Sequence, residues 1–360
     1  MHRWNVHFDR LSSWQQELIS LPFGEPQLIT GIAGSGLSTV AAFRSAALLQ
    51  AGSALRRPRP VVLCSSYLRM LSMRHLLGPL AHQVDLSTVR DWLVRRYVAT
   101  TGESPPPPEN VDWVDLASRT LAAGAKPALS VVLDDAHHLV PELLVAVRVS
   151  THNAFLTAHS TGTANVTSAT GLAEGGNLNR RRRQPRVLID IASAWGAPPA
   201  NSDTEGRPGT GTVLVRQEKV PRVVLEALGR WRKDTGKRLA IATFVPEHVG
   251  LIADLLLDQG LGSKRLFSSD LPRKRMASFD VGQGAIYVLK PGELEGLEFD
   301  EVVVTGAQRA DGDLSESRLN RQLQAIANCC TDRLEITWSD STQAPAAVRV
   351  LRDAIAVVGR

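Results

Sequence analysis

The chain has 360 residues, of which 43% are hydrophobic and 21% are charged, and this balance excludes an intrinsically disordered chain. Its length is sufficient for two domains of ordinary size, each with its own core. The formal net charge of +5 permits an anionic partner such as nucleic acid but does not require one.

Cysteine usage and apolar runs indicate the compartment. Cys64, Cys329 and Cys330 have no metal-ligand spacing, and neighbouring cysteines rarely bridge each other, so we expect a reducing, cytoplasmic setting. The N-terminal residues lack the apolar core of a signal peptide. Nowhere does the sequence approach the ~18 consecutive apolar residues of a membrane helix, so we expect no membrane association.

The first half of the chain alternates short apolar runs with amphipathic stretches. The apolar runs predict buried strands at residues 27–32, 61–66 and 131–136. Helical spacing follows at residues 39–52 and 68–80, and four prolines at 105–108 mark a surface loop. Strands that alternate with helices predict a parallel sheet covered by helices.

A break rich in Ser, Thr, Gly, Ala and Asn follows at residues 151–176, and we interpret it as the linker region between two domains. The alternation then resumes, with helices predicted at 187–195 and 220–237 and strands at 238–244, 285–290 and 301–307. We therefore predict a first domain over 1–165, a second over 166–345 and a C-terminal helix over 346–360.

Residues 31–38, GIAGSGLS, carry the two glycines and the serine of a phosphate-binding loop, G-x-x-x-x-G-K-[ST], but Leu37 replaces the lysine. The segment follows a predicted strand and opens a predicted helix, as such a loop requires. Gly31, Gly34 and Gly36 would let the backbone approach a phosphate, and Ser38 could hold Mg²⁺. A purely structural glycine-rich turn is the alternative interpretation.

The predicted strand VVLDDA ends in two carboxylates. Asp134 is placed to hold Mg²⁺, and Asp135 stands where a glutamate would orient an attacking water. Acidic residues that cap the start of a loop or helix are the alternative.

Together these segments resemble the UvrD/Rep-type superfamily 1 DNA helicases. In the first half, LSSWQQELI resembles the family's Q-motif, QLITGIAGSGLST its phosphate loop, and VVLCSSYLRML and STVRDWL the segments that follow it. VVLDDAHHL is similar to its D-E-x-Q motif. In the second half, LNRRRRQPRVLIDIA, GELEGLEFDEVVV and LQAIANCCTDRLEI resemble the arginine motif, the A-K-G-L-E-F-D segment and the last motif.

The resemblance implies an α/β fold of two RecA-like P-loop NTPase lobes with parallel sheets. The gaps between motifs leave no room for large accessory insertions. It also implies ATP with Mg²⁺ as cofactor and single-stranded DNA as partner. The implied cofactor-binding residues are Gln15, Gly31, Gly34, Gly36, Ser38, Thr39, Asp134 and Arg182, with Ser38 and Asp134 on the metal. The implied nucleic-acid contacts are Tyr67, Trp92, Arg180, Arg181 and Arg183.

Some of these positions have other interpretations. The arginine motif also aligns with Arg181 in place of Arg182, and the whole run could be a solvated basic loop. Trp92 could be a core residue. His137, His138, His152 and His159 are candidate zinc ligands, but no cysteine or acid completes a metal-like spacing.

The departures from the family fall on its catalytic positions. Leu37 replaces the lysine, Asp135 the glutamate and His137 the glutamine, while Cys329 and Thr331 replace both arginines of the last motif. Glu295 reverses the charge of a lysine, and residues 156–165 lack the Asp and Gln of G-D-x-x-Q. At an effective dielectric near 20, a charge pair at 4 Å is worth about 4 kcal/mol, so the lysine alone represents roughly a thousandfold in affinity or rate. We therefore expect no intact catalytic residue.

Three hypotheses follow. The first is a degenerate helicase-fold protein that binds DNA or a protein partner, without ATP hydrolysis, in a repair, recombination or defence complex. The second is an active, divergent ATP-dependent DNA helicase, in which Arg44 or the Arg180–Arg183 run supplies the missing cation. The third is a protein-interaction module that binds neither ATP nor DNA.

Overall fold

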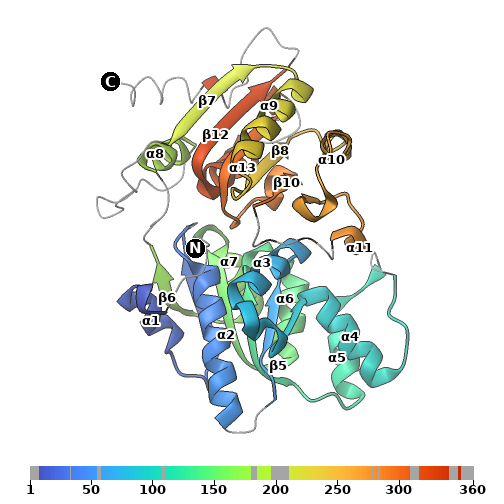
Figure 1. The fold of residues 1–360 in the computed structure, drawn as a ribbon. Helices are drawn as coiled ribbons and strands as arrows, with labels where there is room; N and C mark the ends of the chain where they lie inside the picture. The colour runs from blue at the N-terminus through green and yellow to red at the C-terminus, as the bar shows by residue number, and fades with distance from the viewer. Residues whose placement is uncertain are drawn as a thin grey trace. The chain divides into compact units, whose positions relative to one another are not determined.

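The structure is a computed structural model that describes residues 8–32, 34–54, 58–107, 110–179, 185–195, 211–276, 279, 281, 284–308, 316–339 and 348–349. The chain forms two compact units, Met1–Asn179 and Arg180–Arg360 (Figure 1). Each has its own sheet and core.

The strands of the first unit are β1 (Gln27–Gly31), β2 (Val61–Cys64), β3 (Asp85–Thr88), β4 (Ala128–Asp134), β5 (Thr151–His159) and β6 (Glu174–Leu178). Its α-helices are α1 (Ser13–Ile19), α2 (Leu37–Ala54), α3 (Tyr67–Leu77), α4 (Val89–Thr101), α5 (Trp113–Ala122), α6 (Pro141–Val149) and α7 (Thr163–Thr170). Short 3-10 turns are η1 (Phe8–Arg10), η2 (Gly78–His82), η4 (Ala136–His138) and η5 (Ser160–Gly162).

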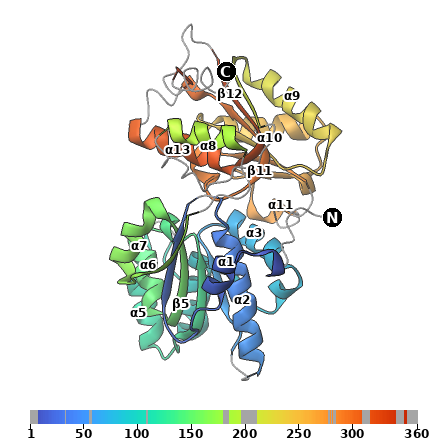
Figure 2. The same cartoon turned by 90° about the vertical axis from the view of Figure 1, so that its left-hand side faces the viewer.

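The six strands form one sheet in the order β3-β2-β4-β5-β1-β6, and every pairing is parallel. The central strands are apolar because helices cover both faces. Helices α1, α2 and α3 lie on one face, and α5, α6 and α7 lie on the other (Figure 2), where α4 packs against α5 and α6. This division follows from right-handed crossovers, since the chain steps from β1 through β2 to β3 and then reverses direction to β4.

The reversal matters for function because β1 and β5 are neighbours in the sheet. The chain leaves β1 toward α2 on one face and leaves β5 toward α7 on the other. Their loops therefore diverge at the carboxyl edge, and such a divergence is where open parallel sheets bind ligands.

The strands of the second unit are β7 (Thr212–Gln217), β8 (Leu239–Thr243), β9 (Leu266–Ser268), β10 (Ile286–Leu289), β11 (Phe299–Thr305) and β12 (Cys330–Trp338). Its helices are α8 (Arg186–Ala194), α9 (Val220–Lys233), α10 (His248–Asp258), α11 (Arg273–Met276) and α13 (Glu316–Cys329), with turns η6 (Ser263–Arg265) and η7 (Pro291–Glu293).

These strands form a second all-parallel sheet, in the order β7-β12-β11-β8-β10-β9. Helices α9 and α10 cover one face, and α8 and α13 cover the other (Figure 2). Charge pairs fix α9 on its face: the buried Glu335 of β12 pairs with Arg216 of β7 at 2.6 Å and with Arg230 of α9 at 2.8 Å.

The predicted α/β class with two parallel sheets is confirmed, but the predicted linker is wrong. Residues 151–176 contain β5, α7 and most of β6, all of which belong to the first unit. The small residues serve close packing, since a Cβ added at Gly176 would collide with the side chain of Leu18 on α1. The units therefore divide after Asn179, later than the predicted division after residue 165.

The predicted C-terminal helix over 346–360 lies outside the described residues, except for Val348 and Arg349, which are helical. Among the residues that the structure describes, no helix combines the length and apolar character needed to cross a membrane.

Candidate functional site

The glycine-rich loop connects β1 to α2 at the carboxyl edge of the first sheet. Gly34 and Gly36 have φ angles of 77° and 93°, in the left-handed region that favours glycine. A Cβ on Gly31 would stand 2.9 Å from the carbonyl oxygen of Leu178, which is closer than real Cβ contacts. The glycines are therefore required by the path of the backbone.

Gln15, the predicted adenine contact, packs against this loop. Its Oε1 accepts a hydrogen bond from the backbone N–H of Ser12 at 3.1 Å, which closes a capping box at the start of α1. Its Nε2 donates to the carbonyl oxygen of Ser35 at 3.1 Å. A Cβ on Gly36 would lie 2.6 Å from this Nε2. Gln15 therefore supports the shape of the loop, and its contact with adenine stays a prediction.

The first residues of α2 join the loop to the acidic motif. Leu37 begins the helix and is 8% exposed, so an apolar side chain is buried where the lysine is expected. The Ser38 side chain lies close enough to Asp134 to lower the pKa of its carboxyl. Thr39 is buried. The structure thus brings the loop serine near the strand-end aspartate, and their shared binding of a metal ion stays a prediction.

Asp134 ends β4 and is 2% exposed. Its Oδ1 accepts a hydrogen bond from the Thr157 hydroxyl of β5 at 2.7 Å. Burial, and next the negative charge of Asp135, raise the pKa of Asp134 from 3.8 to about 7, although Arg69 and the Thr157 and Ser38 hydrogen bonds oppose the shift. This environment therefore favours the protonated form of the Asp134 carboxyl.

Asp135 is held in an unusual conformation beside a buried cation. Its φ of 56° and ψ of 47° are left-handed, and its backbone N–H donates to the Thr157 hydroxyl at 3.2 Å. Its carboxylate forms an ion pair with Arg69 of α3. Both side chains are only 6% exposed. Asp135 is therefore committed to an arginine, in the place where the family resemblance implies a residue that orients water.

Arg69 was not predicted from the sequence. It is the third residue of α3, and its backbone N–H donates to the N-cap Ser66 hydroxyl. The signal that could have identified it is topological. Cys64 pairs with Asp134 in parallel register, so an arginine five residues beyond the end of β2 begins at the same edge as the carboxylates.

The fit of Mg²⁺ and ATP to these residues is partial. The left-handed glycines and the Ser38–Asp134 pair suit a phosphate and its metal. The buried Leu37 supplies no charge to the phosphates, and Arg69 neutralises one of the two carboxylates. The residues present therefore do not fit a magnesium ion shared by Asp134 and Asp135, and we derive no hydrolytic step through one.

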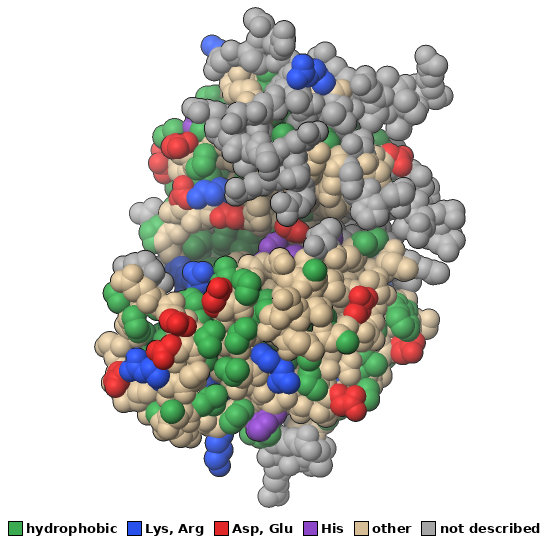
Figure 3. Space-filling view, turned by 180° about the vertical axis from the view of Figure 1, so that it is seen from behind, with side chains coloured by type: hydrophobic (Ala, Val, Ile, Leu, Met, Phe, Trp, Pro, Cys, Tyr) green, Lys and Arg blue, Asp and Glu red, His purple; other side chains and the backbone are tan. Residues whose placement is uncertain are grey.

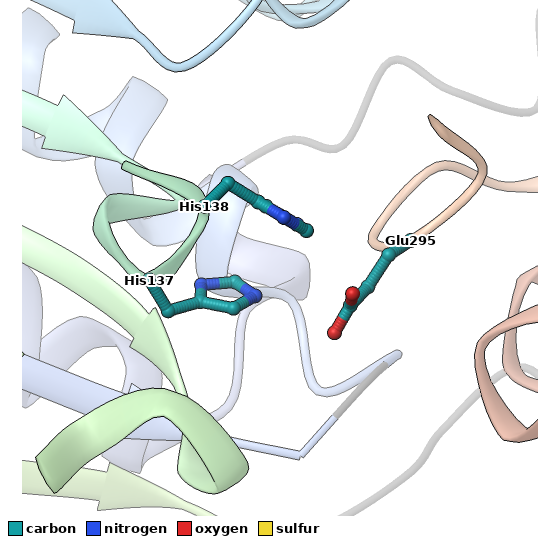
Figure 4. Close-up of side chains that lie close together, drawn as sticks. All are labelled: His137, His138 and Glu295. Carbon is teal, nitrogen blue, oxygen red and sulfur yellow. The ribbon is translucent and has the colours of Figure 1, made fainter. Parts of the chain in front are cut away.

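The histidines after the acidic motif lie on η4, and Figure 4 shows the imidazoles of His137 and His138 there. The His137 Nδ1 accepts a hydrogen bond from the backbone N–H of His159 at 3.1 Å, and the His137 and His138 ring centroids are 4.1 Å apart. A Cβ at Gly162 would collide with His137. His137 thus packs against the segment that follows β5, and a phosphate-sensing role stays a prediction.

Arg44 does not supply the missing cation. Its guanidinium donates to the carbonyl oxygens of Ile19 at 2.7 Å, Leu21, and Pro22 at 2.9 Å, and it lies over the ring of Phe23. Burial lowers its pKa to about 10. The proposal that Arg44 reaches the phosphates is therefore wrong, because this side chain fixes the segment between α1 and β1.

The nucleic-acid candidates divide in the same way. Trp92 is 2% exposed in the core of the first unit, so its proposed stacking on DNA bases is wrong and the core interpretation holds. Tyr67 is half-buried at the start of α3. The predicted arginines Arg180, Arg181, Arg182 and Arg183 lie outside the described residues. On the face in Figure 3, described Lys and Arg side chains are scattered among acidic and apolar ones.

The two positions that replace arginines in the last motif lie at the junction of α13 and β12 in the second unit. The Cys329 thiol donates to the carbonyl oxygen of Ile326 at 3.0 Å, and the Thr331 hydroxyl donates to that of Phe299 at 3.2 Å. Both polar groups therefore bond to the backbone of their own unit.

No protein-family model matches the chain, and no curated protein matches it. Among solved structures, the chain is similar to the C-terminal domain of a possible DNA helicase from Lactobacillus plantarum WCFS1. The identity is 15% and the TM-score 0.33, over 48% of this chain and 95% of that domain. A similarity at this level supports no assignment by itself.

Proposed function

We propose that this chain is a catalytically degenerate helicase-fold protein of UvrD/Rep type that does not hydrolyse ATP. In this proposal it acts as a DNA-binding or regulatory subunit, or as a scaffold, in a DNA repair, recombination or defence complex. One observation carries the proposal. The Ser38 side chain lies near the Asp134 carboxyl, as expected of a phosphate loop beside an acidic strand end, while the neighbouring Leu37 is buried and uncharged.

The charges around this site support a loss of turnover rather than a change of mechanism. Transfer of a phosphoryl group depends on cations at the phosphates and on a group that positions the nucleophile. Leu37 removes a cation, and the ion pair with Arg69 removes the free carboxylate of Asp135. Because Arg44 is held by backbone carbonyls, it does not compensate.

The test combines ATP turnover with DNA binding by the full chain. We expect no increase in ATP hydrolysis when single-stranded DNA is added. We expect fluorescence anisotropy to detect binding of a labelled single strand that weakens steeply between 50 and 200 mM salt, because phosphate contacts release counterions. A DNA-dependent ATPase rate would refute the proposal. An absence of binding at low salt would favour an interaction module that binds a protein only.

Titration calorimetry with Mg·ATP, with and without single-stranded DNA, then defines the form of regulation. Binding without turnover would indicate a nucleotide-operated switch, since ligand binding alone shifts a two-state equilibrium. An absence of binding would leave the loop as a structural element and direct the search to the protein partner.

A further inference from the structure

We propose that Arg69 is a built-in cation that occupies the Asp134–Asp135 pair and excludes a divalent metal ion from it. The inference rests on the proposed function only in treating this pair as a former metal site. It adds a specific claim: replacement of this one arginine by an uncharged residue creates a site for Mg²⁺ or Mn²⁺ in the first unit.

The position of the guanidinium carries the inference. It forms an ion pair with the Asp135 carboxylate, and its charge also acts on Asp134. Both partners of the ion pair are 94% buried, so water does not screen this charge as it would at the surface. The capped start of α3 fixes the Arg69 backbone, because its N–H donates to the Ser66 hydroxyl.

A guanidinium and a divalent ion cannot share these two carboxylates at contact distance. With Arg69 present, the two aspartates have one positive charge to balance them, and an added divalent ion would make the cluster net positive. Repulsion between the guanidinium and a divalent ion is twice that between two single charges at the same distance. Without Arg69, the two charges of the same ion would balance those of two ionised carboxylates, which are the oxygen ligands that Mg²⁺ prefers.

A buried atom of Arg69 without a hydrogen-bond partner supports the same inference. The Nη2 of Arg69 is buried without a hydrogen-bond partner among the described residues. The Arg69 side chain is therefore held mainly by its ion pair with Asp135. An uncharged side chain in its place would leave the Asp135 carboxylate without that partner. Ser38, whose side chain lies near Asp134, supplies a further oxygen for a metal ion at that carboxylate.

The experiment measures Mn²⁺ binding to the full chain by electron paramagnetic resonance of the free ion. The informative variants are Arg69→Met, which removes the charge, and Arg69→Gln, which keeps a hydrogen-bond donor for Asp135. Arg69→Lys is the matched control that keeps the charge. We expect both uncharged variants to bind one Mn²⁺ per chain at least tenfold more tightly than the wild type, and the lysine variant to behave as the wild type. Addition of Asp134→Asn to Arg69→Met should abolish the binding.

The uncharged variants leave Asp135 buried without its ion-pair partner, which lowers their stability. Thermal unfolding in EDTA and in 10 mM Mn²⁺ therefore provides a second measurement. We expect Mn²⁺ to raise the Tm of Arg69→Met and Arg69→Gln and to leave that of the wild type unchanged. Folded uncharged variants without Mn²⁺ binding would overturn the proposal, as would wild-type binding of equal strength. Failure of both variants to fold in Mn²⁺ would also overturn it, because the ion should replace the arginine's charge. ATP turnover and DNA binding test the proposed function separately, since neither is read in this experiment.

Discussion

The replacement Asp134→Asn should stabilise the protein at alkaline pH and leave its stability unchanged at acidic pH. The amide keeps an oxygen that can accept the hydrogen bond of Thr157, so the change removes the ionisable proton and little else. The folded pKa of Asp134 is raised to about 7, against 3.8 ordinarily. Between these values the folded state binds more protons than the unfolded state, so wild-type stability falls as pH rises.

The size of the effect follows from the shift. One pKa unit corresponds to 1.36 kcal/mol, so a shift of about three units gives an upper bound of about 4 kcal/mol above pH 7. The penalty is absent below about pH 4, where the carboxyl is protonated in both states. The asparagine variant carries no such penalty. Its advantage over the wild type should therefore grow from near zero at pH 4 to between about 1 and 4 kcal/mol at pH 8.

The measurement is urea unfolding of both proteins at pH 4, 6 and 8, followed by circular dichroism. The difference between the two proteins at each pH removes the titration of groups common to both. Glu142→Gln, an exposed carboxyl in the first turn of α6, is the control and should change stability by less than about 0.5 kcal/mol at every pH. A difference that does not grow with pH, or an asparagine variant less stable at pH 8, would refute the reasoning.

Three further predictions concern packing. Gly36→Ala should lower the free energy of unfolding in urea by about 2–3 kcal/mol, and Gly34→Ala by about 1 kcal/mol. Both positions have positive φ, but only a Cβ at Gly36 would collide with Gln15, so equal losses would contradict this. Arg44→Met should lower the free energy of unfolding by about 2–4 kcal/mol, because it leaves buried backbone carbonyls without hydrogen-bond donors. The control Arg95→Met removes an exposed arginine and should lower it by less than about 1 kcal/mol. Similar losses for the two variants would contradict a structural role of Arg44. Thiol titration at pH 8 should find no reactive cysteine in the folded protein and three after unfolding, because all three are buried. Burial also raises the pKa of Cys64, and it raises the pKa of Cys330 to about 12. A fast-reacting thiol in the folded protein would contradict the fold. The buried cysteines are Cys64, Cys329 and Cys330.

The strands that could be predicted from the sequence are those buried on both faces. β2, β10 and the end of β4 are continuous apolar runs, and each lies where the sequence predicts it. β6 could not be predicted this way, because its residues EGGNL contain one apolar side chain. Its pairing with β1 depends on Leu18, more than 150 residues earlier, which packs against the bare backbone of Gly176.

The candidate site divides along the same line. Gly34, Gly36, Ser38 and Asp134 could be predicted because a local spacing defines each of them, and the structure brings the serine and the aspartate together. The group that an arginine side chain contacts depends on the tertiary fold and not on its neighbours in the sequence. Arg44 lies 13 residues after the end of β1 and bonds to backbone carbonyls, whereas Arg69 lies five residues after the end of β2 and pairs with a carboxylate. The strand order, which puts β2 beside β4, brings Arg69 to that carboxylate.

The shape of the loop is independent of phosphate, and this limits what the motif implies. Gly31 is needed by its contact with Leu178, and Gly36 by the amide of Gln15, which bonds to Ser35 and caps α1. These contacts would impose the same glycines on a loop that never meets a nucleotide. The positions at which this chain departs from the helicase motifs have internal contacts too, including the ion pair of Asp135 with Arg69 and the hydrogen bond from His159 to His137. The glycines therefore indicate the fold of the loop and not nucleotide binding. The ion pair of Arg69 with Asp135 is the stronger evidence about catalysis, because it leaves Asp135 without a free carboxylate.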